Sequence, residues 1–123
     1  MHGLGDLETA IMDRMWSRQR PASVRDVFED LRRDRTIAYT TVMTVMDKLY
    51  KKGLLCRHPE GRAYLYEPAL THEAYTAQIM RDAFAHGGNQ AVTLVHFLER
   101  LTPNEQAALG TALKVINQPG HQK

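Results

Sequence analysis

The sequence is poor in cysteine and in long apolar runs, and each scarcity excludes a class of protein. Cys56 is the only cysteine in 123 residues, which excludes an internal disulfide and a zinc site built from several cysteines. Uninterrupted apolar runs reach only about three residues, far short of a membrane span. The first residues, Met1-His2-Gly3-Leu4, lack the basic and apolar regions of a secretory signal. We therefore expect a soluble, cytoplasmic protein in a reducing environment, with no membrane partner.

Patterns that carry catalysis or metal binding are also missing. Neither of the two serines, Ser17 and Ser23, lies in a G-x-S-x-G sequence. The six histidines include no pair at i,i+4 spacing and no H-E-x-x-H sequence. Cys56 lies in a strand-like run, where we expect a small buried hydrophobe rather than a nucleophile. The sequence therefore predicts no enzyme, no metal site and no cofactor.

What is present is an ordinary globular composition with an uneven distribution of charge. Apolar residues make up 43% and charged residues 24%, and the length allows one domain, or a small domain with a helical appendage. The net charge is only +2, yet residues 35–62 carry +4, while residues 1–34 and 63–123 each carry −1. This basic block favours an anionic partner, although a merely solvated surface would have the same composition.

Two amphipathic helices are expected at the beginning of the chain. Apolar residues recur at four-residue steps within residues 6–18, which predicts a helix with Asp6 as its N-cap. Ser23 and Asp26 have the spacing of a capping box, which predicts a second helix after Ser23.

A third helix and a hairpin follow. Thr40 is expected to cap the third helix, which ends at Gly53. Strand-like runs then occupy residues 54–58 and 63–67, around a connection at 59–62 that contains proline and glycine. Three helices followed at once by a hairpin are the arrangement of a winged helix-turn-helix.

The remainder of the chain has helical patterns only. Helices are expected over 71–85 and 90–101, and Thr102 and Glu105 form a capping box that opens a last one. The fold class predicted for the whole chain is mainly α with a small β-hairpin. It comprises a winged helix-turn-helix DNA-binding domain at 1–70 and a helical dimerisation region at 71–123.

The third helix has the composition of a helix that reads DNA. One arc of it is apolar and faces the core, through Val42, Val45, Met46 and Leu49. On the opposite arc, threonine methyls and hydroxyls can contact thymine methyls, base edges or phosphates, and lysines can neutralise phosphates. That arc holds Thr40, Thr44, Asp47, Lys48 and Lys51, with Thr41 and Met43 at its edges. A solvent-exposed polar face without a partner is the alternative.

Three neighbouring side chains leave alternatives open. Asp47 either pairs with Lys51 at i,i+4 or accepts from a cytosine amine, and we favour the intrahelical pair. Arg62, at the hairpin tip, is either a DNA-backbone or minor-groove contact or an ordinary turn residue. Tyr64 and Tyr66 are expected to pack against the helices rather than stack on bases.

The C-terminal helices are too apolar to be covered within so short a segment. Around residues 90–101 the apolar side chains cover far more than the ~100° stripe that one core needs. A symmetric partner would bury this surface, and folding back onto the N-terminal domain is the alternative. The residues expected at a dimer interface are Tyr75, Ile79, Met80, Phe84, Leu94, Val95, Phe97, Leu98, Leu101, Leu109 and Leu113.

These motifs together resemble the BlaI/MecI penicillinase-repressor family. The resemblance lies in the segment Ala38–Leu54, which is similar to that family's recognition helix, and in Leu7-Glu8-x-x-Ile11-Met12-x-x-Met15-Trp16 and Pro21-x-x-Val24-x-x-Val27 upstream. Downstream, Arg57-x-x-x-Gly61-Arg62-x-Tyr64-x-Tyr66-x-Pro68 resembles its wing. Tyr39 stands where many members carry tryptophan, and we expect the same packing role of it.

The resemblance implies a homodimeric repressor that binds a palindromic operator. The implied DNA-binding residues are Tyr39, Thr40, Thr41, Met43, Thr44, Asp47, Lys48, Lys51, Lys52 and Arg62. In members that control β-lactam resistance, a membrane sensor-protease pathway leads to cleavage of the repressor. The corresponding bond here is His96–Phe97, where those members have asparagine before phenylalanine. A copper-responsive branch uses a C-terminal cysteine cluster, which this chain lacks. An effector-sensing or protein-binding winged helix is the alternative function.

Overall fold

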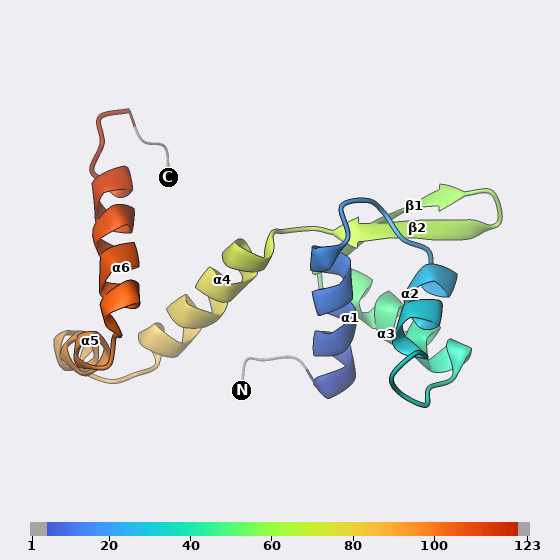
Figure 1. Ribbon diagram of the computed structural model, residues 1–123, viewed down its shortest axis with the longest axis horizontal. Helices are drawn as coiled ribbons and strands as arrows, with labels where there is room; N and C mark the ends of the chain where they lie inside the picture. The colour runs from blue at the N-terminus through green and yellow to red at the C-terminus, as the bar shows by residue number, and fades with distance from the viewer. Residues whose placement is uncertain (1–4, 121–123) are drawn as a thin grey trace. The chain divides into compact units, whose positions relative to one another are not determined.

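The computed structural model describes residues 5–120 of the chain. Over these residues it contains three helices, a two-stranded sheet and three further helices, in that order (Figure 1). The predicted fold class, mainly α with a β-hairpin, is confirmed. No helix in the described range is long and apolar enough to cross a membrane. The elements are α1 (Asp6–Ser17), α2 (Val24–Leu31), α3 (Tyr39–Lys51), β1 (Leu55–Glu60), β2 (Ala63–Pro68), α4 (His72–Ala85), α5 (Gln90–Glu99) and α6 (Pro103–Ile116).

The first two helices begin with different caps. Gly5 is the N-cap of α1, and its amide donates to Glu8 Oε1 at 3.0 Å. The prediction of Asp6 as the cap is therefore wrong, because Asp6 is already the first helical residue and Glu8 supplies the acceptor. The capping box of α2 is confirmed: the Asp26 amide donates to Ser23 Oγ and the Ser23 amide to Asp26 Oδ2, each at 3.0 Å.

Helix α3 begins two residues earlier than the sequence pattern indicates. Its N-cap is Ala38, which has an extended backbone and no side-chain cap, so the prediction that Thr40 caps the helix is wrong. Tyr39 is the first helical residue, and its ring lies edge-on to Phe28 of α2 at a centroid distance of 5.6 Å. This contact between helices accounts for the earlier start, since tertiary packing overrides local capping preference.

Strands β1 and β2 form an antiparallel wing with a tight turn. Their register runs from Leu55 opposite Pro68 to Glu60 opposite Ala63. The predicted four-residue connection is wrong, because Pro59 and Glu60 are paired and only Gly61 and Arg62 remain in the turn. Gly61 has φ +62° whereas Arg62 has no positive φ, which is the combination of a type II′ turn.

Side chains alternate across the wing, and Cys56 lies on its uncovered face. Leu55 is buried, whereas Cys56 is exposed, with Sγ 3.5 Å from the carbonyl oxygen of Glu67. The prediction of a buried Cys56 is therefore wrong, because successive strand residues point to opposite faces and only one face of this hairpin is covered.

The hydrophobic core is formed by the first three helices and the inner face of the wing. From α3 it receives Val42, Met46 and Leu49, as the helical projection predicts, while Val45 is half-buried at its edge. Backbone bonds of 2.9 and 2.8 Å between Ala22 and Tyr66 join the segment before α2 to β2. The buried apolar residues are Ile11, Met12, Met15, Ala22, Val27, Leu31, Val42, Met46, Leu49, Leu54, Leu55 and Tyr66.

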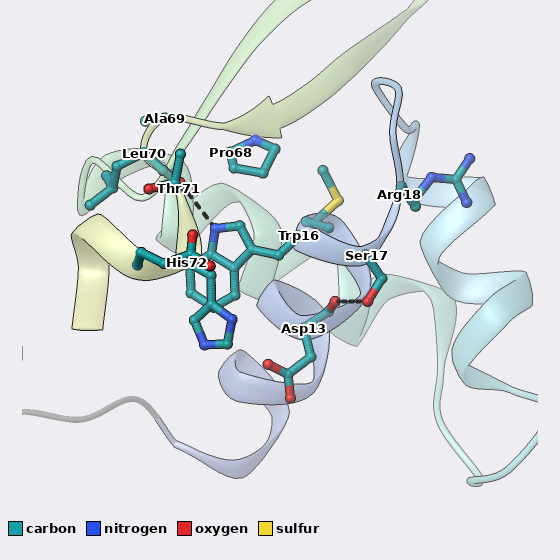
Figure 2. A pocket seen from close by; sticks show the side chains of 11 residues that line it. Asp13, Trp16, Ser17, Arg18, Pro68, Ala69, Leu70, Thr71 and His72 are labelled. Atoms are coloured by element: carbon teal, nitrogen blue, oxygen red, sulfur yellow. Dashed lines mark hydrogen bonds between the residues drawn. The ribbon is translucent and has the colours of Figure 1, made fainter. Parts of the chain in front are cut away.

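The chain divides into two compact units, Met1–Met80 and Arg81–Lys123. The first half of α4 belongs to the winged unit because it docks on Trp16 of α1 (Figure 2). Trp16 Nε1 donates to the carbonyl oxygen of Leu70 at 3.0 Å, and the His72 ring stacks on the indole at 4.4 Å. An open pocket of about 650 Å³ lies beside this junction. The functional division predicted at residue 70 stays a prediction.

The second unit has well-formed helix ends but no buried side chain among residues 81–120. Asn89 caps α5, which ends at Glu99 rather than at the predicted Leu101. The capping box of α6 is confirmed, with the Glu105 amide donating to Thr102 Oγ1 at 3.2 Å and the Thr102 amide to Glu105 Oε1 at 2.9 Å.

Candidate nucleic-acid interface

One face of α3 is exposed along its length. It carries threonine hydroxyls near the N-terminal end of the helix and lysine ammonium groups near the C-terminal end. Thr40, Thr41 and Thr44 are exposed near its N-terminal end, and Lys48 and Lys51 are exposed towards its C-terminal end. The opposite side of the helix is anchored in the core, so this polar face is held rigidly. Among the other sequence-predicted site residues, Met43 is 44% exposed on the same helix. The arrangement offers apolar, hydroxyl and cationic groups to one partner surface.

The carboxylate of Asp47 is paired with two cations, Lys51 and Arg57. Its Oδ2 accepts from Lys51 Nζ at 3.0 Å, which is the intrahelical pair that the sequence favours, and its Oδ1 accepts from Arg57 Nη1 at 2.9 Å. The hydrogen bonds from Lys51 and then Arg57 hold the pKa of the Asp47 carboxyl below its usual range. The carboxylate is therefore compensated within the protein before any phosphate approaches.

Glu8 of α1 forms ion pairs with two lysines at the C-terminal end of α3. Its Oε2 lies 2.9 Å from Lys52 Nζ and 3.8 Å from Lys48 Nζ, and only 8% of the residue is exposed. The hydrogen bond from the Gly5 amide, followed by that from Lys52, lowers the pKa of the Glu8 carboxyl. Lys52 thus has an intramolecular partner that its sequence position did not indicate, and its predicted contact with DNA stays a prediction.

Replacing Glu8 with glutamine is expected to lower the free energy of unfolding at pH 7 by about 1 kcal/mol, because a charge-assisted hydrogen bond is lost. Since the folded pKa is lowered, the stabilisation by the carboxylate is present above the ordinary value of 4.5 and is lost as pH falls through the lowered pKa. Urea unfolding of both proteins from pH 7 downward measures this. A difference between them that stays constant with pH would contradict the ion pair.

Arg57 of β1 is a site residue that the sequence analysis did not single out. Its guanidinium lies between two tyrosine rings, 4.0 Å from the centroid of Tyr50 and 4.2 Å from that of Tyr64. Nη1 also donates to the Tyr66 hydroxyl at 3.1 Å, and this bond is the largest of the effects that raise the pKa of Arg57. Arg57 lies opposite Tyr66 in the antiparallel register of the wing, and the motif Arg57-x-x-x-Gly61-Arg62-x-Tyr64-x-Tyr66 is the sequence signal that was available.

The remaining predicted wing residues differ in their surroundings. Arg62 is exposed in the two-residue turn at the tip. Tyr66 packs into the core as expected, whereas Tyr64 is 44% exposed and lies against Arg57 and Tyr66 of the wing. The expectation of packing against the helices is therefore right for Tyr66 and wrong for Tyr64, which lies nearer the tip, beyond the reach of the core.

Tyr39 has the packing role that was expected of it. Besides its edge-on contact with Phe28, its ring lies under the guanidinium of Arg25 at 4.7 Å. The aromatic ring thus fixes the N-terminal end of α3 against α2.

Of the eleven side chains that were predicted to form a dimer interface, six are exposed and five are half-buried. Leu98 is 45% exposed and Val95 53% exposed, values that are high for aliphatic side chains. Tyr75 instead lies against Trp16 at a ring distance of 5.5 Å within the winged unit. Of the predicted set, Met80, Leu94, Val95, Phe97, Leu98 and Leu113 are exposed, and Tyr75, Ile79, Phe84, Leu101 and Leu109 are half-buried.

Comparison with known proteins decides the class of this site. The profile of the family described as penicillinase repressor matches residues 4–115. The chain belongs to the penicillinase-repressor family. It is accordingly a DNA-binding transcriptional repressor with a winged helix-turn-helix, and not an enzyme.

Named relatives support the same assignment. The chain is 44% identical over 121 residues to the transcriptional regulator BlaI of Mycobacterium tuberculosis, covering 96% of this chain and 87% of the relative. It is 29% identical over 72 residues to the penicillinase repressor of Bacillus licheniformis, covering 58% of this chain and 56% of that one.

Two solved structures resemble the winged unit. The solution structure of the DNA-binding domain of the repressor BlaI is similar with a TM-score of 0.53 and 29% identity, over 58% of this chain and 87% of that one. The monomeric form of Bacillus licheniformis BlaI in complex with the blaP half-operator is similar with a TM-score of 0.50 and 29% identity, over 59% and 88%.

Proposed function

We propose that this protein represses transcription as a homodimer that binds a palindromic operator. The observation that carries the proposal is the exposed threonine-and-lysine face of α3, held rigidly by a buried opposite face and followed at once by a wing with Arg62 at its tip. A related repressor has been solved on a half-operator, and a half-operator implies a second half for a second copy.

Each element has a distinct part in the proposed complex. Helix α3 lies in the major groove, where Thr40, Thr41 and Thr44 contact base edges and phosphates. Lys48 and Lys51 neutralise phosphates farther along the groove, and Arg62 reaches the adjacent backbone or minor groove. Met43 adds an apolar contact, while Tyr39 and Asp47 act chiefly by fixing their neighbours.

Dimerisation follows from the apolar surface of the C-terminal region. Leu94, Val95, Leu98 and Leu113 are exposed, and no side chain of their own unit is buried among residues 81–120. A second copy supplies an identical apolar surface, and a two-fold pair of this kind presents two recognition helices to half-sites about one DNA turn apart, ~34 Å or a multiple of it.

Operator binding is expected to weaken steeply with salt. If Lys48, Lys51 and Arg62 of two copies each neutralise one phosphate, the slope of log K against log salt is roughly −5. Fluorescence anisotropy on a palindromic duplex between about 50 and 200 mM salt measures the slope. A flat response would contradict phosphate-driven binding.

Derepression by proteolysis is the proposed regulatory step. His96 and Phe97 lie within α5 and are both exposed, and cleavage between them removes Leu98, Leu113 and all of α6 from the dimer surface. We expect cells in which the protein is derepressed, with a β-lactam as the first inducer to try, to contain a fragment that ends at His96, detectable by mass spectrometry. Derepression with the chain still intact would contradict this step.

A further inference from the structure

Arg57 joins the wing to the recognition helix through four side chains. From β1 it reaches Asp47 and Tyr50 on α3, and it also contacts Tyr64 and Tyr66 on β2. Two contacts are hydrogen bonds, of 2.9 and 3.1 Å, and two are faces of tyrosine rings about the guanidinium. A planar cation between two rings is restrained in both position and tilt.

The geometry argues against a direct phosphate contact by Arg57. Its side chain is only 19% exposed, and the same nitrogen, Nη1, already donates to both Asp47 and Tyr66. By contrast, the side chain of Lys51 is 70% exposed, and Arg62 lies at the open tip of the wing. The exposed Arg62, rather than Arg57 itself, is therefore the wing cation that can reach a phosphate.

A two-stranded hairpin needs tertiary contacts such as these to restrain its turn. The base of the wing is anchored by Tyr66 and its backbone pairing with Ala22, but Tyr64 and the turn lie beyond the core. An isolated two-stranded sheet is marginally stable in water. The contacts of Arg57 are therefore the restraint that extends outward from the anchored base towards Arg62.

We propose that Arg57 is a positioning residue for operator binding: it fixes the wing against α3 and so holds Arg62 where it can meet the DNA backbone. It also neutralises the negative charge of Asp47, which would otherwise repel the phosphates of the operator. This inference rests on the proposed function, and it assigns to Arg57 no contact with DNA of its own.

A double-mutant cycle between Arg57→Ala and Arg62→Ala tests the proposal on operator duplex at fixed salt. Arg62→Ala alone is expected to weaken binding several-fold, and Arg57→Ala alone by about tenfold, since it misplaces Arg62 and leaves Asp47 less compensated. With Arg57 already replaced, removing Arg62 is expected to cost less than about twofold more, because the misplaced arginine no longer contributes. Fully additive losses would overturn the proposal.

Arg100→Ala is the matched control, because it removes an arginine from the second unit. Its cycle with Arg62→Ala is expected to be additive, as for distant and independent sites. If Arg57→Ala does not fold, Arg57→Lys replaces it in the same cycle, since lysine keeps the charge but lacks the planar group that two rings enclose.

Amide hydrogen exchange separates this inference from the proposed function, because it needs no DNA. Arg57→Ala is expected to speed exchange in residues 55–68 while leaving α1 and α2 protected. If the wild-type chain bound no operator, the proposed function would fail. Hydrogen exchange alone would then show whether Arg57 fixes the wing against α3. Unchanged hydrogen exchange in residues 55–68 of Arg57→Ala would overturn the proposal that Arg57 fixes the wing.

Discussion

Replacing Lys48 and Lys51 together with alanine is expected to weaken operator binding by roughly a hundredfold or more at low salt. Both side chains are largely exposed on the polar face of α3, at 60% and 70%. A dimer loses four cations in this way, so the magnitude of the salt slope is expected to fall by roughly 3 to 4. Anisotropy titrations of both proteins over a range of salt measure both effects.

The double substitution has a matched control of equal charge. Arg100→Ala with Lys114→Ala removes two cations per chain from exposed positions in the second unit. This control is expected to bind the operator within about twofold of the wild-type protein, since whole-chain charge contributes little once it is screened. Undiminished binding by the Lys48 and Lys51 variant would remove α3 from the proposed DNA interface.

Replacing Leu98 with aspartate is expected to convert the protein to a monomer at micromolar concentration. Leu98 is 45% exposed in the single chain, so each copy tolerates the charge, but a symmetric interface would bury it twice. Affinity for the whole palindrome is expected to fall roughly a hundredfold or more, because the second half-site loses its tethered copy. Affinity for a half-operator is expected to stay unchanged.

Analytical ultracentrifugation and titrations on whole and half operators measure these outcomes. Thr9→Asp is the control, because it adds the same charge at an exposed position of α1 in the winged unit. It is expected to leave the oligomeric state unchanged. A dimeric Leu98→Asp protein would place the interface elsewhere.

Features of the fold that depend on neighbours in sequence were predictable. The capping boxes of Ser23 with Asp26 and of Thr102 with Glu105 are made by residues three apart, and both are present. The Asp47–Lys51 pair, one helical turn apart, was predicted for the same reason.

Features that depend on distant contacts were missed. The start of α3 moved to Tyr39 because that ring packs on Phe28 of another helix. The partner of Lys52 is Glu8, which lies far away in the sequence. Arg57 was overlooked as a site residue because its contacts come from α3 and from the other strand of the wing, β2. Local patterns carry no information on such juxtapositions.

The most direct test is the stoichiometry and spacing dependence of binding to the palindrome delimited by a footprint upstream of the protein's own gene. We expect two chains per duplex, and a large loss of affinity when half a helical turn is inserted between the half-sites, since the two copies are joined and must meet successive grooves. One chain per duplex, or equal affinity for both spacings, would contradict paired recognition by a dimer.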